Sequence, residues 1–170
     1  MSCDVGFKGK DEVQTEDIST RIITCSETGN WTNLPTCIRK DCGNVNYLNT
    51  INAYIRRQKK STEYESTAEI DCDAGFHNKN IIQTSEISTT TITCSDRGTW
   101  IGIPTCIPKD CGQLPSLSNG KISYVSNMTT FASKAVYICD NGYQVNGSDT
   151  IECKDTGKWS DYTTYCQIKE

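Results

Sequence analysis

Residues 153–159 read Cys-Lys-Asp-Thr-Gly-Lys-Trp, and the pattern Cys-x-x-x-Gly-x-Trp that they contain occurs three times in the chain. The other two copies are Cys-Ser-Glu-Thr-Gly-Asn-Trp at 25–31 and Cys-Ser-Asp-Arg-Gly-Thr-Trp at 94–100. A pattern that recurs in this way indicates a repeated structural unit rather than one large domain.

The repetition extends well beyond this pattern. Residues 3–43 align with residues 72–112 at a constant offset of 69 without a gap, and more than half of the aligned positions are identical. A third copy, from Cys111 to Cys166, has diverged further. Only four residues, 38–41 and 107–110, separate one copy from the next. We therefore expect closely linked modules in an elongated, bead-on-string arrangement.

The 11 cysteines among the 170 residues fit this repetition. The second and third copies hold four cysteines each, and the first holds three because it lacks a counterpart of Cys42. We therefore expect the chain to begin inside a module. Only 35% of the residues are hydrophobic, and the mean hydropathy is -0.53. Small modules of this composition need disulfides for stability, and disulfides indicate an oxidising, extracellular compartment.

The local sequence favours an all-β fold. No window shows the sustained 3.6-residue periodicity of an amphipathic helix. Stretches rich in Ile, Val, Tyr and Thr, bounded by turn residues, predict strands at 19–24, 89–93, 121–125 and 134–138. No run approaches the ~20 apolar residues that a membrane-spanning helix needs, so we expect no membrane insertion. The disulfide framework argues against a nuclear protein that binds nucleic acid.

The framework resembles the sushi module, also called the complement control protein module or short consensus repeat. The resemblance rests on the three Cys-x-x-x-Gly-x-Trp copies, on Cys-Asp-Asn-Gly-Tyr at 139–143, and on Pro-x-Cys at 35–37 and 104–106. It implies small, disulfide-rich, all-β modules in tandem. The first module, 1–39, is truncated; the second, 40–108, and the third, 109–168, are complete.

The spacing of four cysteines alone allows three pairings per module. The resemblance implies first-to-third and second-to-fourth pairing, which leaves Cys25 without a partner. It also implies that Trp31, Trp100 and Trp159 each pack against a disulfide in a core. The implied pairs are Cys42–Cys94, Cys72–Cys106, Cys111–Cys153, Cys139–Cys166 and, in the first module, Cys3–Cys37.

No catalytic, cofactor or metal site is expected. His77 is the single histidine, and it would have to serve any Cys–His or Ser–His pair. It is better explained as an exposed loop residue, because Lys8 occupies the aligned position in the first module. The cysteines are committed to disulfides and no Cys-x-x-Cys pair is present, which argues against zinc. No glycine-rich phosphate loop is present either.

The strongest candidate for binding is a basic run in the second module, formed by Arg56, Arg57, Lys59 and Lys60. Such a run suits sulfated glycans or an acidic face of a protein. Acidic residues at 63, 65, 69 and 71 follow closely and offset its field. The alternative is therefore a solvated segment with no binding role.

Weaker candidates lie elsewhere in the chain. Two long polar insertions, 8–21 and 77–90, offer side chains to a partner or merely extend a hairpin. The junction residues Arg39, Lys40, Pro108 and Lys109 are candidates because sushi proteins often bind partners across adjacent modules. Three Asn-x-Ser/Thr sequons predict N-glycosylation at Asn30, Asn127 and Asn146.

The resemblance implies a non-catalytic binding protein that is secreted or forms the extracellular part of a cell-surface protein. Its expected partner is an extracellular protein, such as a complement component or a cell-surface protein. One alternative is a spacer or adhesion segment of a mosaic cell-surface or matrix protein. The other is the regulatory sushi region of a complement-type serine protease, whose catalytic domain would lie outside this sequence.

Overall fold

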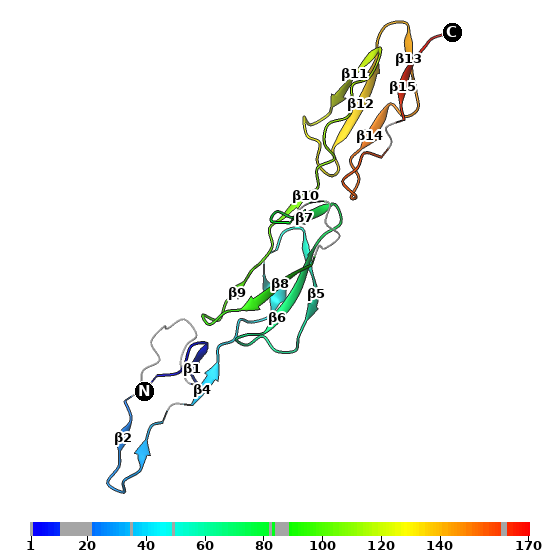
Figure 1. Cartoon of the computed structure of the whole chain (residues 1–170). Coiled ribbons are helices and arrows are strands. Elements are labelled where there is room, and N and C mark those ends of the chain that lie inside the picture. The colour runs from blue at the N-terminus through cyan, green and yellow to red at the C-terminus, as the bar shows by residue number, and fades with distance from the viewer. Residues whose placement is uncertain are drawn as a thin grey trace. The chain divides into compact units, whose positions relative to one another are not determined.

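A computed structural model describes residues 2–10, 22–34, 36–48, 50–81, 83, 89–160 and 163–170. The chain divides into two compact units. The first unit comprises Met1–Asp71 and Thr89–Pro104, and the second comprises Cys72–Ser88 and Thr105–Glu170. The second module contributes to both units. Each unit is built from small antiparallel sheets (Figure 1), and among the described residues there is no α-helix.

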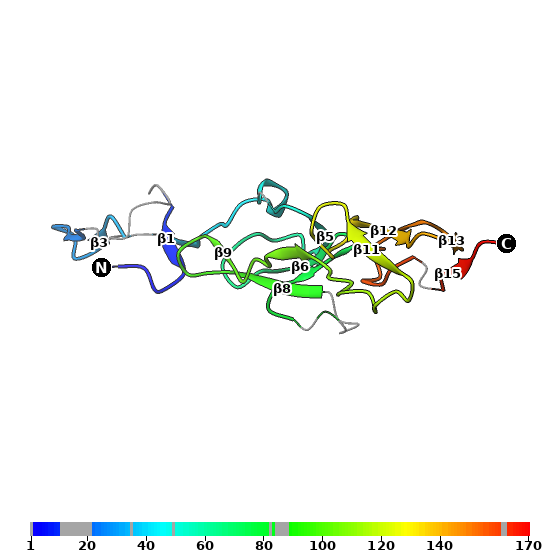
Figure 2. The same ribbon diagram turned by 90° about the horizontal axis from the view of Figure 1, so that it is seen from above.

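A four-stranded sheet is the largest sheet of the first unit (Figures 1 and 2). The register of its two central strands places Ala68 opposite Ile92 and Glu69 opposite Thr91. Side chains alternate between the two faces of a sheet, so the first pair faces the core and the second pair faces solvent. The strand order is β5 (Ala53–Gln58), β6 (Thr67–Cys72), β8 (Thr89–Cys94) and β9 (Trp100–Ile101).

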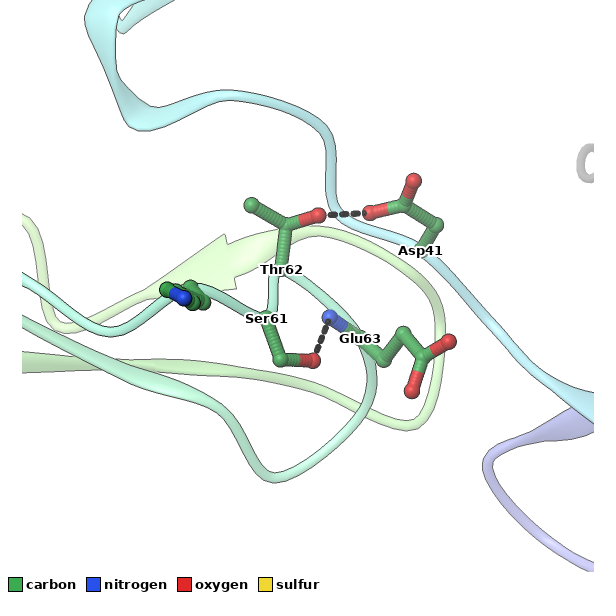
Figure 3. Close-up of a pocket in the computed structure, with 5 residues that line it drawn as sticks. Asp41, Ser61, Thr62 and Glu63 are labelled. Carbon is green, nitrogen blue, oxygen red and sulfur yellow. Dashed lines mark hydrogen bonds between the residues drawn. The ribbon is translucent and has the colours of Figure 1, made fainter.

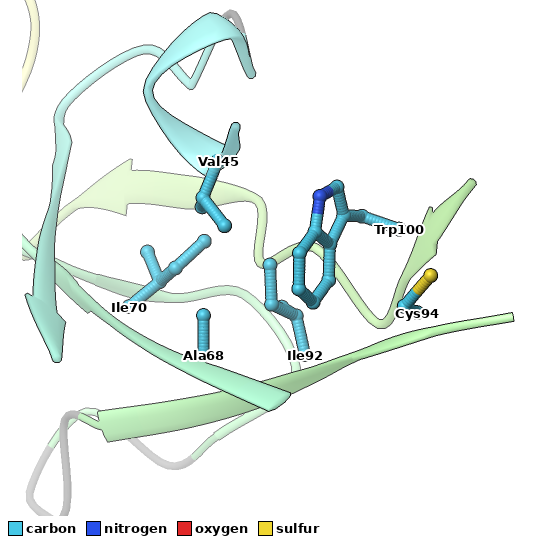
Figure 4. Close-up of a cluster of buried hydrophobic side chains, with 6 residues drawn as sticks. All are labelled: Val45, Ala68, Ile70, Ile92, Cys94 and Trp100. Atoms are coloured by element: carbon cyan, nitrogen blue, oxygen red, sulfur yellow. The ribbon is translucent and has the colours of Figure 1, made fainter. Parts of the chain in front are cut away.

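The core of the first unit gathers around Trp100 (Figure 4). Val45 reaches it from a short 3-10 helix, η1 (Val45–Tyr47), whose first turn is capped by the side chain of Asn44. The indole N–H of Trp100 donates to the carbonyl of Gly43 at 3.0 Å, so the ring is buried while its polar group stays paired. The buried cluster consists of Val45, Ala68, Ile70, Ile92, Cys94 and Trp100.

The first module supplies two further ladders to this unit. Strand β1 (Phe7–Gly9) pairs with β4 (Cys37–Arg39), and β2 (Thr24–Cys25) pairs with β3 (Trp31–Thr32). Trp31 is 59% exposed and Cys25 has no disulfide. The expectation that Trp31 packs against a disulfide in a core is therefore wrong. The residues that cover the aligned Trp100 come from segment 42–71, which has no counterpart within 3–39.

The second unit holds the rest of the second module and the whole third module. Its core cluster contains Ala135, Tyr137, Ile151, Cys153 and Trp159, and the indole N–H of Trp159 donates to the carbonyl of Gly112 at 2.9 Å. Its sheets are β7 (Phe76–Asn78) with β10 (Cys106–Pro108), β11 (Gly120–Tyr124) with β12 (Lys134–Cys139) and β14 (Thr150–Glu152), and β13 (Tyr143–Asn146) with β15 (Tyr165–Ile168).

The predicted strands at 89–93, 121–125 and 134–138 correspond to β8, β11 and β12, within one residue at each end. The predicted strand at 19–24 reaches the observed β2 only at Thr24, and residues 19–21 lie outside the described part of the chain.

Five disulfides link the sheets, and each lies within one unit. Each module of this size buries too little apolar surface to be stable by packing alone. In the chain-entropy model, each crosslink contributes roughly 4 kcal/mol. The pairs are those that the resemblance implies: Cys3–Cys37, Cys42–Cys94, Cys72–Cys106, Cys111–Cys153 and Cys139–Cys166.

The junction between the first and second modules lies inside the first unit. The N–H of Lys40 donates to the carbonyl of Gly6 at 2.9 Å, and the carbonyl of Lys40 accepts from the N–H of Tyr64 at 2.7 Å. The ring of Tyr64 meets Phe7 edge-on, with 6.4 Å between centroids. Two backbone hydrogen bonds and one aromatic pair therefore join the modules here.

The junction between the second and third modules, inside the second unit, repeats this construction. The N–H of Lys109 donates to the carbonyl of Gly75 at 2.8 Å, and its carbonyl accepts from the N–H of Phe131 at 2.8 Å. Phe131 meets Phe76 edge-on at 5.8 Å. Gly75 has a φ of 85°, and a Cβ at this position would overlap the ring of Phe131. The position therefore requires glycine for two reasons, its backbone angle and the close approach of the ring.

The third module provides a comparison within the same chain. Gly142 occupies the position of Gly75 in the Cys-Asp-x-Gly motif and has a φ of 88°, but a Cβ there would meet nothing within 4 Å. Its carbonyl accepts from the N–H of Lys169 at 2.9 Å. The two glycines thus share a backbone conformation and differ in whether an aromatic ring covers them.

Substitution of Gly75 should loosen the junction that it forms. Gly75→Ala and Gly142→Ala both place a side chain at positive φ, which costs about 1–2 kcal/mol. Only Gly75→Ala also overlaps a ring, which adds about 1–3 kcal/mol of strain. We expect Gly75→Ala to speed hydrogen exchange at the amides of Lys109 and Phe131, measured by mass spectrometry. Gly142→Ala is the control, and equal exchange at these amides in both variants would contradict the assignment.

Candidate binding surfaces

The basic run lies at the edge of the four-stranded sheet. Arg56 and Arg57 are the fourth and fifth residues of β5, and Lys59 and Lys60 follow the strand. All four side chains belong to exposed residues. Consecutive residues of a strand point to opposite faces, so the run does not form one continuous basic patch. The structure distributes its charges over three local environments.

Arg56 is engaged with the sheet itself. Its guanidinium donates to the hydroxyl of Thr89 at 2.8 Å and lies 3.6 Å from a carboxylate oxygen of Asp71. The side chain of Asp71 is only 6% exposed. The same oxygen accepts from the hydroxyl of Tyr54 at 3.3 Å, while the other oxygen, Oδ1, is buried without a hydrogen-bond partner. The charge of Arg56 therefore offsets a buried carboxylate.

Arg57 and Lys59 line a small cavity of about 100 Å³ together with Glu69 and Thr91. Glu69 is the closest of the acidic residues that follow the run to be placed in this cavity. A carboxylate beside two cations reduces the potential that they present to an anion. This part of the surface remains cationic by one charge, counted over the lining residues.

Lys60 lines an open hollow of about 430 Å³ with Asp41, Ser61, Thr62 and Glu63 (Figure 3). The hydroxyl of Thr62 donates to the carboxylate of Asp41 at 2.5 Å, and the N–H of Glu63 donates to the hydroxyl of Ser61. Two carboxylates and one ammonium group face this hollow. It therefore suits a polar partner of mixed charge better than a polyanion.

The junction residues from sequence are built into the fold. Arg39 donates to the carbonyl of Tyr64 at 3.0 Å, pairs with Glu65 at 3.3 Å, and stacks over the ring of Phe7 at 5.8 Å. Pro108 is the last residue of β10, opposite Phe76. The ammonium group of Lys109 donates to the carbonyl of Asp155 at 2.8 Å. These side chains hold modules together, as do the backbone contacts of Lys40.

Asp110 and Asp41 fix the start of the third and second modules by the same contacts. The carboxylate of Asp110 accepts from the hydroxyl of Thr129 at 2.6 Å and from the N–H of Gly112 at 2.9 Å. These donors favour the charged carboxylate, so they lower the pKa of Asp110 below its ordinary value. The resulting stability is present above the pKa of the unfolded chain and is lost as the pH falls through the lower folded value.

The side chain of Gln83 was not singled out by sequence and makes a two-point contact at the second junction. Its amide nitrogen donates to the carbonyl of Asp110 at 2.7 Å, and its amide oxygen accepts from the N–H of Asp110 at 2.8 Å. The rest of the insertion 77–90 is described only at 77–81 and 89–90. In the insertion 8–21, residues 11–21 lie outside the described part of the chain.

The other surface residues that sequence reasoning missed are apolar. Tyr47 is 88% exposed and Ile51 is 76% exposed, on the segment that precedes β5. Large apolar side chains of this kind are the usual energetic centre of protein interfaces. Both are large residues placed in a segment without strand alternation, which is the signal that could have identified them. A further hollow, of about 250 Å³, lies beside Trp159 and Leu114 in the third module.

The structure gives His77 no catalytic environment. It lies on β7, is half-buried, and its Nδ1 lies 3.1 Å from the carbonyl of Asn78 and 3.3 Å from that of Ile81. The described residues contain no group of three or more His, Cys, Asp or Glu side chains that could hold a metal ion. Within the same residues, no helix has the length and apolar character needed to cross a membrane.

The three sequon asparagines differ in their surroundings. Asn30 and Asn127 are exposed. The amide nitrogen of Asn146 donates to the hydroxyl of Tyr165 at 3.0 Å and to the side chain of Gln167 at 2.7 Å. A glycan on this nitrogen would replace one of its two hydrogens, so folded Asn146 is a poorer attachment site than the other two.

Comparison with known families assigns the repeated unit. The family model "Sushi repeat (SCR repeat)" matches residues 42–106 and 111–166. The chain belongs to the sushi repeat family. The two matches lie within the second and third modules, and each spans the four cysteines of its module.

Several curated proteins with sushi repeats are similar to the chain. "Sushi, von Willebrand factor type A, EGF and pentraxin domain-containing protein 1" of Rattus norvegicus is 30% identical over 140 residues, which cover 81% of this chain and 4% of that protein. "Beta-2-glycoprotein 1" of Homo sapiens is 28% identical over 166 residues, with coverages of 94% and 43%. "C4b-binding protein" of Mus musculus is 28% identical over 158 residues, with coverages of 88% and 31%. The chain spans less than half the length of each.

Removal of Arg56 should destabilise the first unit more than removal of its neighbour. Arg56→Ala leaves the buried carboxylate of Asp71 without its cation, and an unsatisfied buried acceptor costs about 1–3 kcal/mol. Arg57→Ala removes the same charge without exposing a buried partner. We expect urea unfolding of the sheet, followed by hydrogen exchange at β6 and β8, to occur at lower urea in Arg56→Ala only. Identical midpoints would show that Asp71 does not depend on Arg56.

Proposed function

We propose that this chain is a non-catalytic recognition segment of an extracellular protein and that its partner is a protein of the complement type. The observation that carries the proposal is the tandem sushi framework, supported by the similarity to a protein named for binding C4b. The five disulfides suit a secreted protein or the extracellular part of a cell-surface protein.

The surface that we assign to this contact is the segment around Tyr47 and Ile51. Both side chains project large apolar groups into solvent, and the exposed cations Arg57, Lys59 and Lys60 lie on and after the following strand. An apolar centre with a charged margin is the usual composition of a protein interface. The mixed charge of the nearby hollow at Asp41 and Lys60 suits a protein better than a simple anion.

Binding to complement proteins tests this proposal. We expect the chain to bind immobilised C4b in surface plasmon resonance, and the double variant Tyr47→Ala/Ile51→Ala to bind at least about tenfold more weakly. Val125→Ala, which removes a side chain that is 69% exposed on the third module, is the control. Binding that is equal in all three proteins would contradict the assigned surface.

The alternatives predict different results in the same experiment. A spacer or adhesion segment of a mosaic protein, as the name of the rat relative suggests for that protein, would bind none of the soluble complement proteins. The regulatory sushi region of a complement-type serine protease would bind a complement protein in a chain that also carries a catalytic domain. Sequencing of the complete reading frame separates these two cases from the first proposal.

A sulfated glycan is the second candidate ligand, favoured by the exposed side chains of Arg57, Lys59 and Lys60. Arg56 is excluded from this site because it is engaged with Asp71. We expect Arg57→Ala/Lys59→Ala/Lys60→Ala to elute from heparin at lower salt than the unchanged chain, because fewer cations contact the polyanion. Lys121→Ala/Lys134→Ala/Lys158→Ala removes the same charge from exposed positions of the third module. Equal elution of the two triple variants would dismiss a specific glycan site.

A further inference from the structure

Three residues of the first module form an open face: Ile23, Cys25 and Trp31. Their counterparts at the offset of 69 are Ile92, Cys94 and Trp100, which are 0%, 0% and 7% exposed. In the first module Ile23 is half-buried, Cys25 is exposed and Trp31 is 59% exposed. The thiol of Cys25 makes one contact, a weak hydrogen bond to the neighbouring carbonyl of Ser26 at 3.7 Å.

The second and third modules record what covers this face when it is complete. In both, a Cys-Gly-x-Val or Cys-Gly-x-Leu segment lies on the tryptophan. Its cysteine forms the disulfide, Cys42–Cys94 or Cys111–Cys153. Its glycine carbonyl accepts from the indole N–H, at 3.0 and 2.9 Å. Its apolar residue, Val45 or Leu114, packs in the core around the ring.

The strand beside the open face also has a free edge among the described residues. In the second module β8 pairs with β9 on one side and with β6 on the other. In the first module the aligned strand β2 pairs with β3, the counterpart of β9, and belongs to a two-stranded sheet. An unpaired edge of this kind accepts an added strand through main-chain hydrogen bonds.

We propose that the open face is a docking site for an extended segment of another polypeptide, with the sequence Cys-Gly-x-(Val or Leu) followed by strands equivalent to β5 and β6. Such a segment is the N-terminal half of a sushi module. It would satisfy three groups together: the indole N–H of Trp31, the thiol of Cys25 and the free edge of β2. The first module would then act as a receptor that is completed by its ligand.

The covalent part of this capture is a thiol oxidation. A sulfur–sulfur bond forms between Cys25 and the cysteine of the segment, and each thiol gives up a proton and an electron. Oxidised glutathione takes both electrons and both protons and breaks into two molecules of reduced glutathione. Apolar contact with Trp31 precedes this step and determines which thiol reaches Cys25.

The chain supplies its own probe, a synthetic peptide with the sequence of residues 40–71. This peptide carries one cysteine, at the position of Cys42, the counterpart of Val45, and both strands. Two variants separate recognition from simple thiol exchange. Val45→Asp keeps the cysteine but places a charge against the indole. Cys42→Ser keeps the apolar contact but cannot form the disulfide.

The full chain is incubated with each peptide in a glutathione redox buffer and mapped by mass spectrometry. We expect a disulfide between Cys25 and the unchanged peptide, at least about tenfold more abundant than with the Val45→Asp peptide, because a buried unpaired carboxylate is strongly disfavoured. We also expect the emission of Trp31 to shift to the blue with the unchanged peptide and the Cys42→Ser peptide. The emission of Trp31 is obtained by subtracting the spectrum of a Trp31→Phe chain.

Three results would overturn the proposal. The first is equal yield of the disulfide with the unchanged and Val45→Asp peptides, which would mean simple thiol exchange. The second is an unchanged emission of Trp31 when the peptide is bound. The third is a preference of the chain for a Cys25–Cys25 dimer of two copies over the peptide, which would identify a second copy as the occupant.

Discussion

The contact between a tryptophan and the first disulfide of its module is the interaction on which the rest of each complete module depends. In the second module the indole of Trp100 lies against Cys94, Ile92 and Val45, and its N–H is tied to the carbonyl of Gly43. The disulfide and the hydrogen bond join the same two segments, so each holds the other in place. Burial of one such ring contributes about 1.5–3 kcal/mol, comparable to one crosslink. A module with so small a core has few other sources of stability.

This dependence explains why the binding candidates lie away from the core. The sheets are thin, and one face of each is occupied by the tryptophan and its neighbours. The opposite face and the connecting segments carry the polar and exposed apolar side chains, including Tyr47, Ile51 and the basic run. Loops held by a crosslinked framework can vary without loss of the fold, which suits a module whose role is recognition.

The sequence could predict the disulfide framework, the strands of the third module and β8, because these follow from local pattern and repetition. It could not predict how the charges of the basic run are distributed. The pairing of Arg56 with Asp71 depends on strands that lie side by side although 15 residues separate the two side chains. The junction rings had no local signal either, because Tyr64 and Phe131 lie far along the chain from the glycines that they cover. The exposure of Trp31 differed from expectation because a conserved-looking pattern says nothing of whether its covering segment is present.

The construction of the junctions has a consequence for how such chains grow. Each module carries both halves of a joint within its own sequence: a glycine with a following Phe or Tyr near its exit, and, in the second and third modules, an aromatic residue near its start. Duplication of one module by an unequal crossover would therefore create a matching joint at both ends of the new copy. No compensating substitution would be needed in the neighbours. Lengthening of the array is, in this sense, a change that the fold accepts in a single genetic event.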